Sequence, residues 1–170
     1  MNLEVTLTAM QAWIFLPLAL PIALWACYTD ITEFKIKNVT VLALLAGFIV
    51  LGPFAMGWDE YAWRFAHFGV VLAVGFVLSA GMGIGAGDAK FAAAMAPFFA
   101  LADWLFVLIL FAVVLIAAFV THRGARRIPA VRRAFPDWES WARKDFPMGL
   151  ALSGTLLAYF ALALRTPLPA

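Results

Sequence analysis

Long apolar stretches dominate this sequence and restrict its fold more than any other feature. Between residues 89 and 120 the only charged side chains are Lys90 and Asp103. A helix crosses a bilayer with about 20 mostly apolar residues, so this stretch is too long for a single spanning helix. Over the whole chain 65% of residues are hydrophobic and 13% are charged, whereas soluble domains contain about 25% charged residues. The sequence therefore predicts an all-α integral membrane protein that forms a single domain over residues 1–170.

Six transmembrane helices are expected. The stretch at residues 89–120 divides at Asp103-Trp104 into two segments, and Pro97 is expected to kink the first of them, which is short for a span. The six segments are Ala9–Tyr28, Val39–Met56, Ala62–Ala80, Ala89–Ala102, the remainder of that stretch up to Val120, and Met148–Leu164. No basic residue precedes the first segment, and a cleaved secretory signal needs one, so we expect the first helix to be retained.

Positive charges fall in alternate connections between these segments. Lys and Arg concentrate in cytoplasmic loops. Most of them lie after the first segment, after the glycine-rich run, or in a long loop at about residues 121–147: Lys35, Lys37, Lys90, Arg123, Arg126, Arg127, Arg132, Arg133, Arg143 and Lys144. The other connections carry only Arg64, and the C-terminal tail carries Arg165. We therefore expect the N- and C-termini outside and the three basic connections in the cytoplasm.

A glycine-rich run separates the third and fourth segments and ends at Asp88. Glycine occupies positions 81, 83, 85 and 87, and its backbone freedom allows a chain to leave one helix, turn and begin another. Asp88 then opens the fourth segment, where a helix N-terminus favours negative charge. Taken alone, this pattern also fits a simple turn in which Asp88 caps the helix.

A second acid, Asp30, closes the first segment on the same predicted side of the membrane. Carboxylates at membrane depth are costly and are functional by default, although Asp30 alone also fits a solvated loop acid near Lys35. Two neighbouring carboxylates share a proton, so that one activates a water and the other polarises a peptide carbonyl. The pair therefore predicts an aspartic protease with Asp30 and Asp88 as catalytic residues, without a metal or another cofactor.

Three further features bear on this hypothesis. Glu33 is the one rival acid near Asp30, and we expect Glu33→Gln to keep much of the activity. Lys90 either orients a substrate carbonyl or anchors the chain at the cytoplasmic face. The segment from Pro136 to Phe146 has tryptophans at helical spacing and is predicted to form a short helix on the bilayer surface.

Several segments resemble the type IV prepilin peptidases, a family of membrane aspartic proteases. Gly85-Ala86-Gly87-Asp88 resembles their GxGD signature. Asp30 followed by Ile36 and Asn38 is similar to their upstream aspartate segment, with Lys37 in place of the usual proline. Pro147-Met148-Gly149 resembles a Pro-aromatic-Gly element of the family, with Met148 in place of the aromatic residue.

This resemblance implies removal of the leader peptide from prepilins or pseudopilins at the cytoplasmic face of the bacterial inner membrane, in type IV pilus assembly or protein secretion. Asp30 and Asp88 carry over as the catalytic pair, and the resemblance makes Gly85, Gly87, Asn38, Pro147 and Gly149 candidates for shaping the site. The chain is similar to the short form associated with tight-adherence (Flp) pili. With Cys27 as its single cysteine, we expect no cysteine-rich methyltransferase domain and no methylation.

Other classes of function remain open at this level. A small multi-span transporter or channel subunit would use the two aspartates to relay protons or a cation, with the glycines as an unwound helix. A membrane scaffold would carry both acids for structure alone. A related GxGD protease that cuts inside membrane helices would place its acids deeper in the spans. The expected partners are a prepilin substrate helix and the lipid bilayer, with no nucleic acid; the sequence assigns no oligomeric state.

Overall fold

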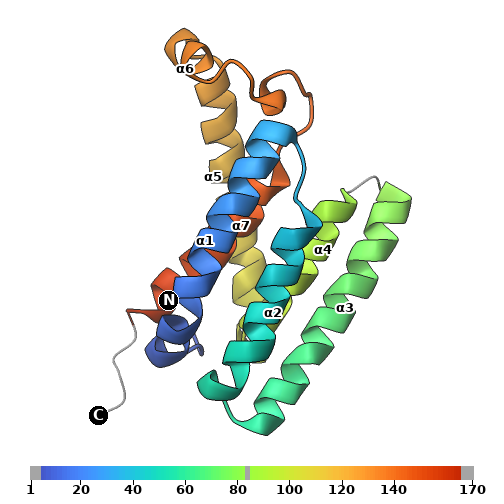
Figure 1. Ribbon diagram of the computed structural model, residues 1–170, viewed down its shortest axis with the longest axis vertical. Coiled ribbons are helices and arrows are strands. Elements are labelled where there is room, and N and C mark those ends of the chain that lie inside the picture. The colour runs from blue at the N-terminus through green and yellow to red at the C-terminus, as the bar shows by residue number, and fades with distance from the viewer. Residues whose placement is uncertain (1–4, 83–84, 166–170) are drawn as a thin grey trace.

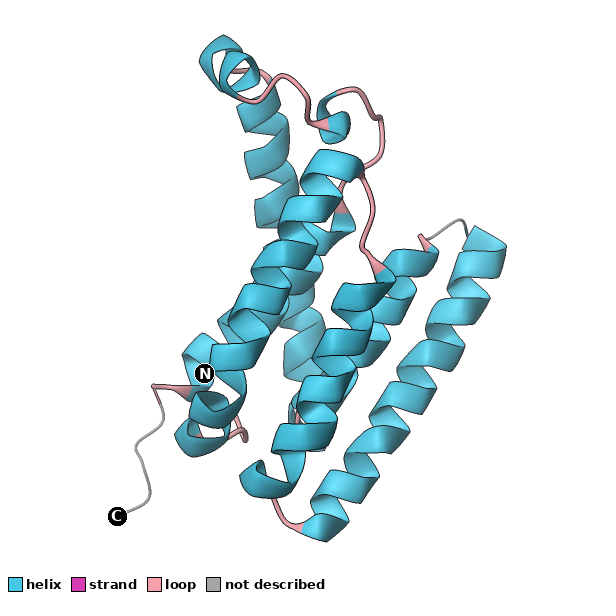
Figure 2. Ribbon diagram, viewed as in Figure 1, coloured by secondary structure: helices cyan, strands magenta, loops and turns pink. Residues whose placement is uncertain are grey.

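The protein is a bundle of helices, most of them joined by short connections (Figures 1 and 2). The computed structural model describes residues 5–82 and 85–165. Its elements, with η for short 3-10 helices, are α1 (Ala9–Glu33), α2 (Asn38–Ala55), α3 (Trp58–Met82), α4 (Ala86–Met95), η1 (Ala96–Phe98), η2 (Leu101–Asp103), α5 (Trp104–Arg126), α6 (Pro129–Ala134), η3 (Glu139–Trp141) and α7 (Met148–Ala163). These two ranges contain no strand, so the all-α prediction is confirmed for them.

Four segments are long and apolar enough to cross a membrane. They are α1, α2, most of α3, and the stretch Leu101–Arg126 that joins η2 to α5. The helices in the other two predicted spans are shorter, with 10 residues in α4 and 16 in α7, and only α7 is a short apolar helix. A span of the usual length needs about 20 residues, so the predicted count of six spans is met for four segments and stays a prediction for the other two.

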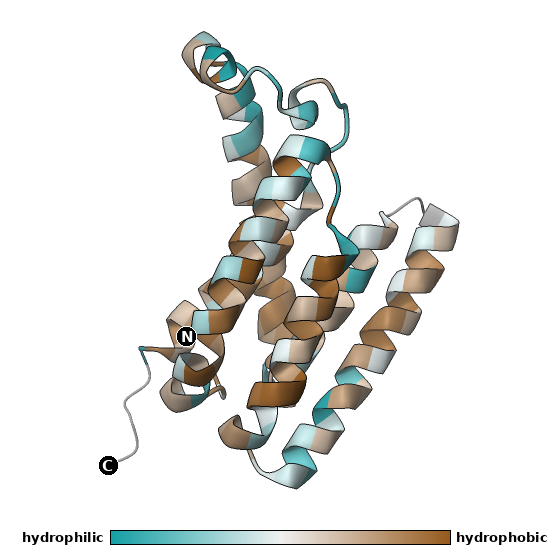
Figure 3. Ribbon diagram, viewed as in Figure 1, coloured by the Kyte–Doolittle hydropathy of each residue, from teal (hydrophilic) through white to brown (hydrophobic). Residues whose placement is uncertain are grey.

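The outer surfaces of the helices are suited to lipid. Only 6% of the span containing α5 and 11% of that in α3 is buried inside the protein. One exposed face of α5 carries Leu105, Ile109, Val113 and Ile116, three or four residues apart. In Figure 3 apolar colours cover much of α2 and the lower part of α5, and polar colours gather toward the ends of the bundle. Since soluble proteins rarely expose apolar patches of this extent, this is a multi-pass membrane protein.

Successive long helices alternate in direction and bring the basic connections to one end of the bundle (Figure 1). The end of α1, the starts of α2, α4 and α7, the end of α5 and all of α6 lie there; we call it the basic end. The start of α1 and the end of α7 lie at the opposite end. This arrangement agrees with the predicted alternation of the loops. That the basic end faces the cytoplasm remains a prediction.

An aromatic cluster at the centre of the bundle explains why the fourth segment is not one continuous helix. Phe15, Phe48, Phe98 and Phe160, from α1, α2, η1 and α7, are fully buried. The ring of Phe98 lies 5.0 Å from that of Phe15 and 5.3 Å from that of Phe48, both edge to face. The prediction of one helical segment over Ala89–Ala102 is wrong, because α4 ends at Met95. The break lies next to Pro97, where a kink was expected, since proline cannot donate a helical hydrogen bond; Pro97 itself lies in η1.

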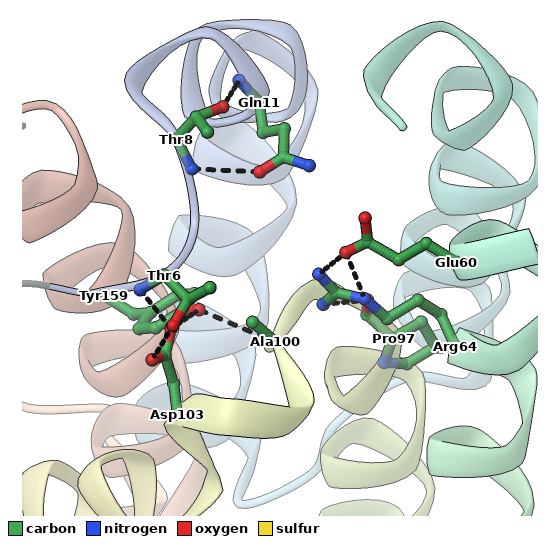
Figure 4. Close-up of polar contacts among 9 residues, drawn as sticks. All are labelled: Thr6, Thr8, Gln11, Glu60, Arg64, Pro97, Ala100, Asp103 and Tyr159. Carbon is green, nitrogen blue, oxygen red and sulfur yellow. Dashed lines mark hydrogen bonds and ion pairs between the residues drawn. The ribbon is translucent and has the colours of Figure 1, made fainter. Parts of the chain in front are cut away.

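A buried polar network closes the end of the bundle opposite the basic end (Figure 4). The carboxylate of Asp103 accepts hydrogen bonds from the backbone N–H of Thr6 (2.8 Å), the hydroxyl of Thr6 (2.7 Å) and the hydroxyl of Tyr159 (2.7 Å). The Tyr159 oxygen in turn accepts from the N–H of Ala100 at 3.2 Å. These bonds satisfy a carboxylate that is only 6% exposed and join the segment before α1 to η2 and α7.

Arg64 of α3 lies beside this network and donates a hydrogen bond to the backbone where the fourth segment leaves the α-helical path (Figure 4). Its guanidinium donates to the carbonyl of Pro97 at 3.2 Å and pairs with Glu60 at 2.6 Å. Backbone carbonyls released where a helix breaks need such partners when they are buried. The one basic side chain of the predicted outer connections therefore has a structural role.

The long loop at the basic end folds differently from the prediction. The expected surface helix between Pro136 and Phe146 is wrong, because only the single turn of η3 forms there. Trp141 is 5% exposed, donates from its indole N–H to the carbonyl of Phe135 at 2.8 Å and stacks on His122 at 5.1 Å. The tryptophan spacing thus serves to pack the loop against the end of α5, not to form a helix.

Candidate active site

Asp30 lies on the last turn of α1 and faces the interior of the bundle. It is 4% exposed, and one carboxylate oxygen, Oδ2, accepts a hydrogen bond of 2.6 Å from the backbone N–H of Gly149. Gly149 is the second residue of α7, and the first N–H groups of a helix have no partner within the helix. Asp30 therefore caps a neighbouring helix, at an end where the helix dipole stabilises negative charge.

Glycine is needed at position 149 because Asp30 lies directly against it. A Cβ placed on Gly149 would lie 2.9 Å from the Cβ of Asp30 and 3.0 Å from its Oδ2. Pro147, buried just before α7, is the N-cap residue of that helix. The family resemblance made Pro147 and Gly149 candidates for shaping the site, and both lie behind Asp30.

Asp88 lies on the first turn of α4, three residues after the N-cap residue Gly85. A Cβ on Gly85 would come 2.5 Å from Oδ2 of Asp88, so only glycine leaves room for the carboxylate to fold back over the start of the helix. Gly83, in the same glycine-rich run, lies outside the described residues. The run does what the sequence predicted within the described part, since α3 ends at Met82 and α4 begins at Ala86.

A close backbone contact brings the Asp30 and Asp88 segments together. A Cβ on Gly87 would lie 3.3 Å from the carbonyl oxygen of Ile36, in the connection between α1 and α2. That distance is too short for most side chains to be accommodated without a shift. The glycine next to Asp88 therefore lets the start of α4 approach the connection that follows Asp30.

Asp30 and Asp88 line one cavity of about 410 Å³ at the basic end. Gly85, Gly87, Asn38 and Lys90 also line it. Asn38 is the first residue of α2, and both it and Lys90 are exposed. Of the eight residues singled out from the sequence, six thus surround this cavity and two, Pro147 and Gly149, support it from behind.

Sequence reasoning missed three apolar side chains of this cavity: Phe34, Phe146 and Met148. Phe34 ends α1 in the left-handed conformation, with φ 52°, which is unusual for a residue other than glycine. The guanidinium of Arg143 lies over its ring, 5.2 Å from the centroid. No local sequence pattern predicts that Phe34 or Phe146 lines the cavity. Met148 lies between Pro147 and Gly149, in the element that resembles the Pro-aromatic-Gly element of the family.

A second cavity, of about 310 Å³, begins at Asp88 and is almost entirely apolar. Side chains of α3, α4, α5 and α7 line it, among them Val74, Ala92, Phe111 and Leu152. Met148 and Asp88 border both cavities. The carboxylate of Asp88 thus lies where a polar opening at the basic end meets an apolar space between the helices.

The two acids differ in their surroundings. Asp30 accepts the hydrogen bond from Gly149, and among the described residues no hydrogen bond to Asp88 is present. Asp88 lies outside the four long spans, and burial raises the pKa of its carboxyl to about 7, with the negative charge of Asp30 adding to the increase. A raised pKa favours the protonated form near neutral pH.

Glu33, the rival acid, does not line the cavity. Its carboxylate pairs with Lys37 at 2.7 Å, and its side chain is 49% exposed. Within the described ranges no group of three His, Cys, Asp or Glu side chains is placed to hold a metal ion. The arrangement at the cavity is thus that of two carboxylates from different helices facing a common space, which suits acid–base chemistry on a substrate.

Comparison with known proteins places the chain in a family. No curated protein and no solved structure matches it. The model of the type IV leader peptidase family matches residues 5–121, a range that contains both Asp30 and Asp88. Because this match covers more than half of the 170 residues, the chain belongs to the type IV leader peptidase family.

Proposed function

We propose that this protein is an aspartic endopeptidase that removes the leader peptide of a type IV prepilin or pseudopilin at the cytoplasmic face of the bacterial inner membrane. The observation that carries the proposal is the convergence of Asp30 from α1 and Asp88 from α4 on one cavity. Membership of a leader peptidase family supports a peptide bond as the target.

The unequal surroundings of the two acids support a division of roles. The N–H of Gly149 and the start of α7 stabilise a carboxylate at Asp30, so Asp30 is the general base that takes a proton from the attacking water. Asp88, with a pKa of about 7, holds a proton and donates a hydrogen bond to the scissile carbonyl oxygen. That proton stabilises the tetrahedral intermediate, and the proton taken up by Asp30 then passes to the leaving amine.

The two adjoining cavities support a substrate with a polar leader and an apolar helix. The polar opening beside Lys90 and Asn38 has room for the residues before the cut. The apolar space between α3, α4, α5 and α7 suits apolar side chains at the start of the hydrophobic helix after the cut. The scissile bond then lies at the junction, next to Asp88.

Cleavage of a candidate prepilin by the purified protein in detergent tests the proposal. Wild type, Asp30→Asn and Asp88→Asn are compared with Glu33→Gln, the matched control for loss of a nearby exposed acid. The proposal expects leader removal by wild type and Glu33→Gln and at least a thousandfold loss in both Asn variants, because each removes half of a two-carboxylate mechanism.

The same assay separates this function from a transporter or channel subunit. A proton or cation relay needs a gradient across a membrane, and detergent micelles hold none. Cleavage that persists in both Asn variants would refute the catalytic pair. Absence of cleavage with every prepilin of a panel, at verified folding, would refute the peptidase.

A further inference from the structure

A third cavity, also at the basic end, is lined mainly by arginines. These arginines lie far in the sequence from Asp30 and Asp88. The cavity has a volume of about 1250 Å³ and lies between the last turns of α5 and helix α6. Its lining includes one aromatic side chain, Phe119, and five arginines: Arg123, Arg126, Arg127, Arg132 and Arg133. The turn at Arg127 and Ile128 places α6, which begins at Pro129, next to the end of α5, and this brings the two sets of arginines to one space.

The positive charges around this cavity are not neutralised by the protein. The ion pairs found within residues 5–82 and 85–165 join Lys37 to Glu33, Arg64 to Glu60 and Arg143 to Glu139. None of them involves an arginine of the cavity. Where these arginines make hydrogen bonds, they donate to backbone carbonyls: Arg123 to Lys144, Arg126 to Arg143 and Arg133 to Pro129. Five guanidinium groups around one space therefore favour an anion.

The composition of the cluster indicates which anion. Every basic residue of the cavity is arginine, although Lys144 lies in the same loop. A planar guanidinium binds the oxygens of a phosphate in pairs, which an ammonium group does not. A group of five has enough donors for more than one phosphate.

The position of the cluster indicates where that phosphate comes from. Arg123 and Arg126 end the apolar span Leu101–Arg126, so the cavity lies at the level where a bilayer changes from hydrocarbon to headgroups. Just below, Ile116 and Val120 are 65% and 62% exposed. The ring of Phe119 holds the Arg123 guanidinium at 5.3 Å. A ligand with a phosphate and acyl chains would contact both surfaces: the phosphate would bind the arginines of the cavity, and the acyl chains would pack on the exposed apolar side chains of α5.

We propose that these five arginines form a binding site for the phosphate headgroup of an anionic phospholipid, in the leaflet at the basic end of the bundle. The site is a pocket lined by specific residues. Binding there is therefore distinct from the general attraction of basic loops to a membrane. Its existence does not depend on the peptidase activity, because it rests on α5, α6 and their arginines.

The test measures lipid binding to the purified full-length protein in a nonionic detergent by native mass spectrometry. The probes are diphosphatidylglycerol, phosphatidylglycerol and the uncharged control phosphatidylethanolamine. The variant Arg127→Gln/Arg132→Gln removes two exposed arginines whose guanidinium groups make no hydrogen bond to another described residue. The matched control, Arg143→Gln/Lys144→Gln, removes the same charge from the same loop outside the cavity.

We expect the wild type to bind the two anionic lipids in preference to phosphatidylethanolamine, with diphosphatidylglycerol the tighter. Loss of one exposed guanidinium–phosphate contact should weaken binding about fivefold. The double variant, which loses two such contacts, should therefore bind about 30-fold more weakly, and the control, which loses none in the cavity, less than threefold. If the double variant fails to fold, Arg127→Gln and Arg132→Gln alone are each expected to weaken binding about fivefold.

Three results would overturn the site. Equal weakening in the pocket variant and the control would mean general attraction without a pocket. Equal binding of phosphatidylethanolamine and the anionic lipids by wild type would remove the role of the phosphate charge. Displacement of the lipid by an equal concentration of inorganic phosphate would assign the arginines to a soluble anion.

Discussion

Replacing Gly149 by alanine tests whether the position of Asp30 is set by the start of α7. The substitution keeps the N–H that donates to Asp30 at 2.6 Å, but it adds a methyl group 2.9 Å from the Asp30 Cβ and 3.0 Å from Oδ2. Carbon atoms in contact prefer a separation of about 3.5–4.0 Å. The Asp30 side chain must therefore move by roughly 1 Å, and a displacement of that size in a reacting group lowers rates about 100-fold.

Gly154→Ala, on the same helix, is the matched control. There the added methyl would lie 2.9 Å from a side-chain methyl of Val114, so the overlap is similar but no acid is involved. Packing an extra methyl costs about 1–3 kcal/mol, and replacing a helical glycine by alanine offsets about 0.5–1 kcal/mol of it. Both variants should thus unfold at similar temperatures.

The assay is the initial rate of prepilin cleavage by purified protein, with kcat and KM separated and thermal unfolding measured in parallel. We expect Gly149→Ala to lower kcat about 100-fold with little change in KM, since Gly149 does not line the cavity proposed to hold the substrate. Gly154→Ala should keep its kcat. A kcat for Gly149→Ala within threefold of that of Gly154→Ala would refute the proposed positioning of Asp30.

Three further outcomes are expected. Cleavage should follow a bell-shaped pH profile whose alkaline limb lies near pH 7, because the raised pKa keeps Asp88 protonated below about 7 and that proton is lost above it; a flat profile from pH 5 to 9 would contradict the pairing with Asp30. Glu33→Gln should retain at least half of the wild-type rate, because this exposed residue pairs with Lys37 and does not line the cavity; complete loss would mean that the catalytic acid of α1 was misassigned. Tyr159→Phe should lower the free energy of unfolding by about 1–3 kcal/mol and leave kcat unchanged, because it removes the buried bond to Asp103 at 2.7 Å at the end away from the acids; unaltered denaturation would contradict this.

Elements bounded by abrupt changes in polarity were predicted well. The predicted Val39–Met56 and Met148–Leu164 correspond to α2 at Asn38–Ala55 and α7 at Met148–Ala163, because each apolar run is flanked by polar residues, glycine or proline. Predictions for α1 stopped at Tyr28, yet the helix continues to Glu33. Hydropathy marks the apolar part of a helix, and the polar end of α1, where Thr29 and Asp30 are buried but Glu33 is exposed, lies beyond it.

The break in the fourth segment was predicted only in part. Apart from Lys90 its residues are apolar up to Asp103, and Pro97 alone indicated a kink. No local pattern indicated that α4 ends at Met95 or that tertiary packing brings Phe98 into contact with Phe15 and Phe48. Helix α6 was missed for the opposite reason. Its six residues, Pro129–Ala134, are short and basic, and they lack the apolar periodicity that identifies a helix.

For the candidate site, the local sequence located the acids but not their surroundings. The glycines around Asp88 predicted a turn on general grounds, and the structure gives two of them specific neighbours, Asp88 itself for Gly85 and Ile36 for Gly87. Phe34 joined the site through a left-handed turn that nothing in its neighbours predicts. Such partners come from distant parts of the chain, so they depend on the tertiary fold.

The location of both acids at helix ends has a physical reason. A carboxylate in the middle of a span is costly, and hydrolysis needs water that the hydrocarbon region lacks. Asp30 and Asp88 lie instead at the basic end. There the N-terminus of α7 stabilises negative charge on Asp30, and the N-terminus of α4 stabilises it on Asp88. The apolar cavity that begins at Asp88 extends between the helices from that point. This arrangement favours a peptide cut where its polar part meets its apolar helix, and it disfavours the alternative of a protease that cuts deep inside a span.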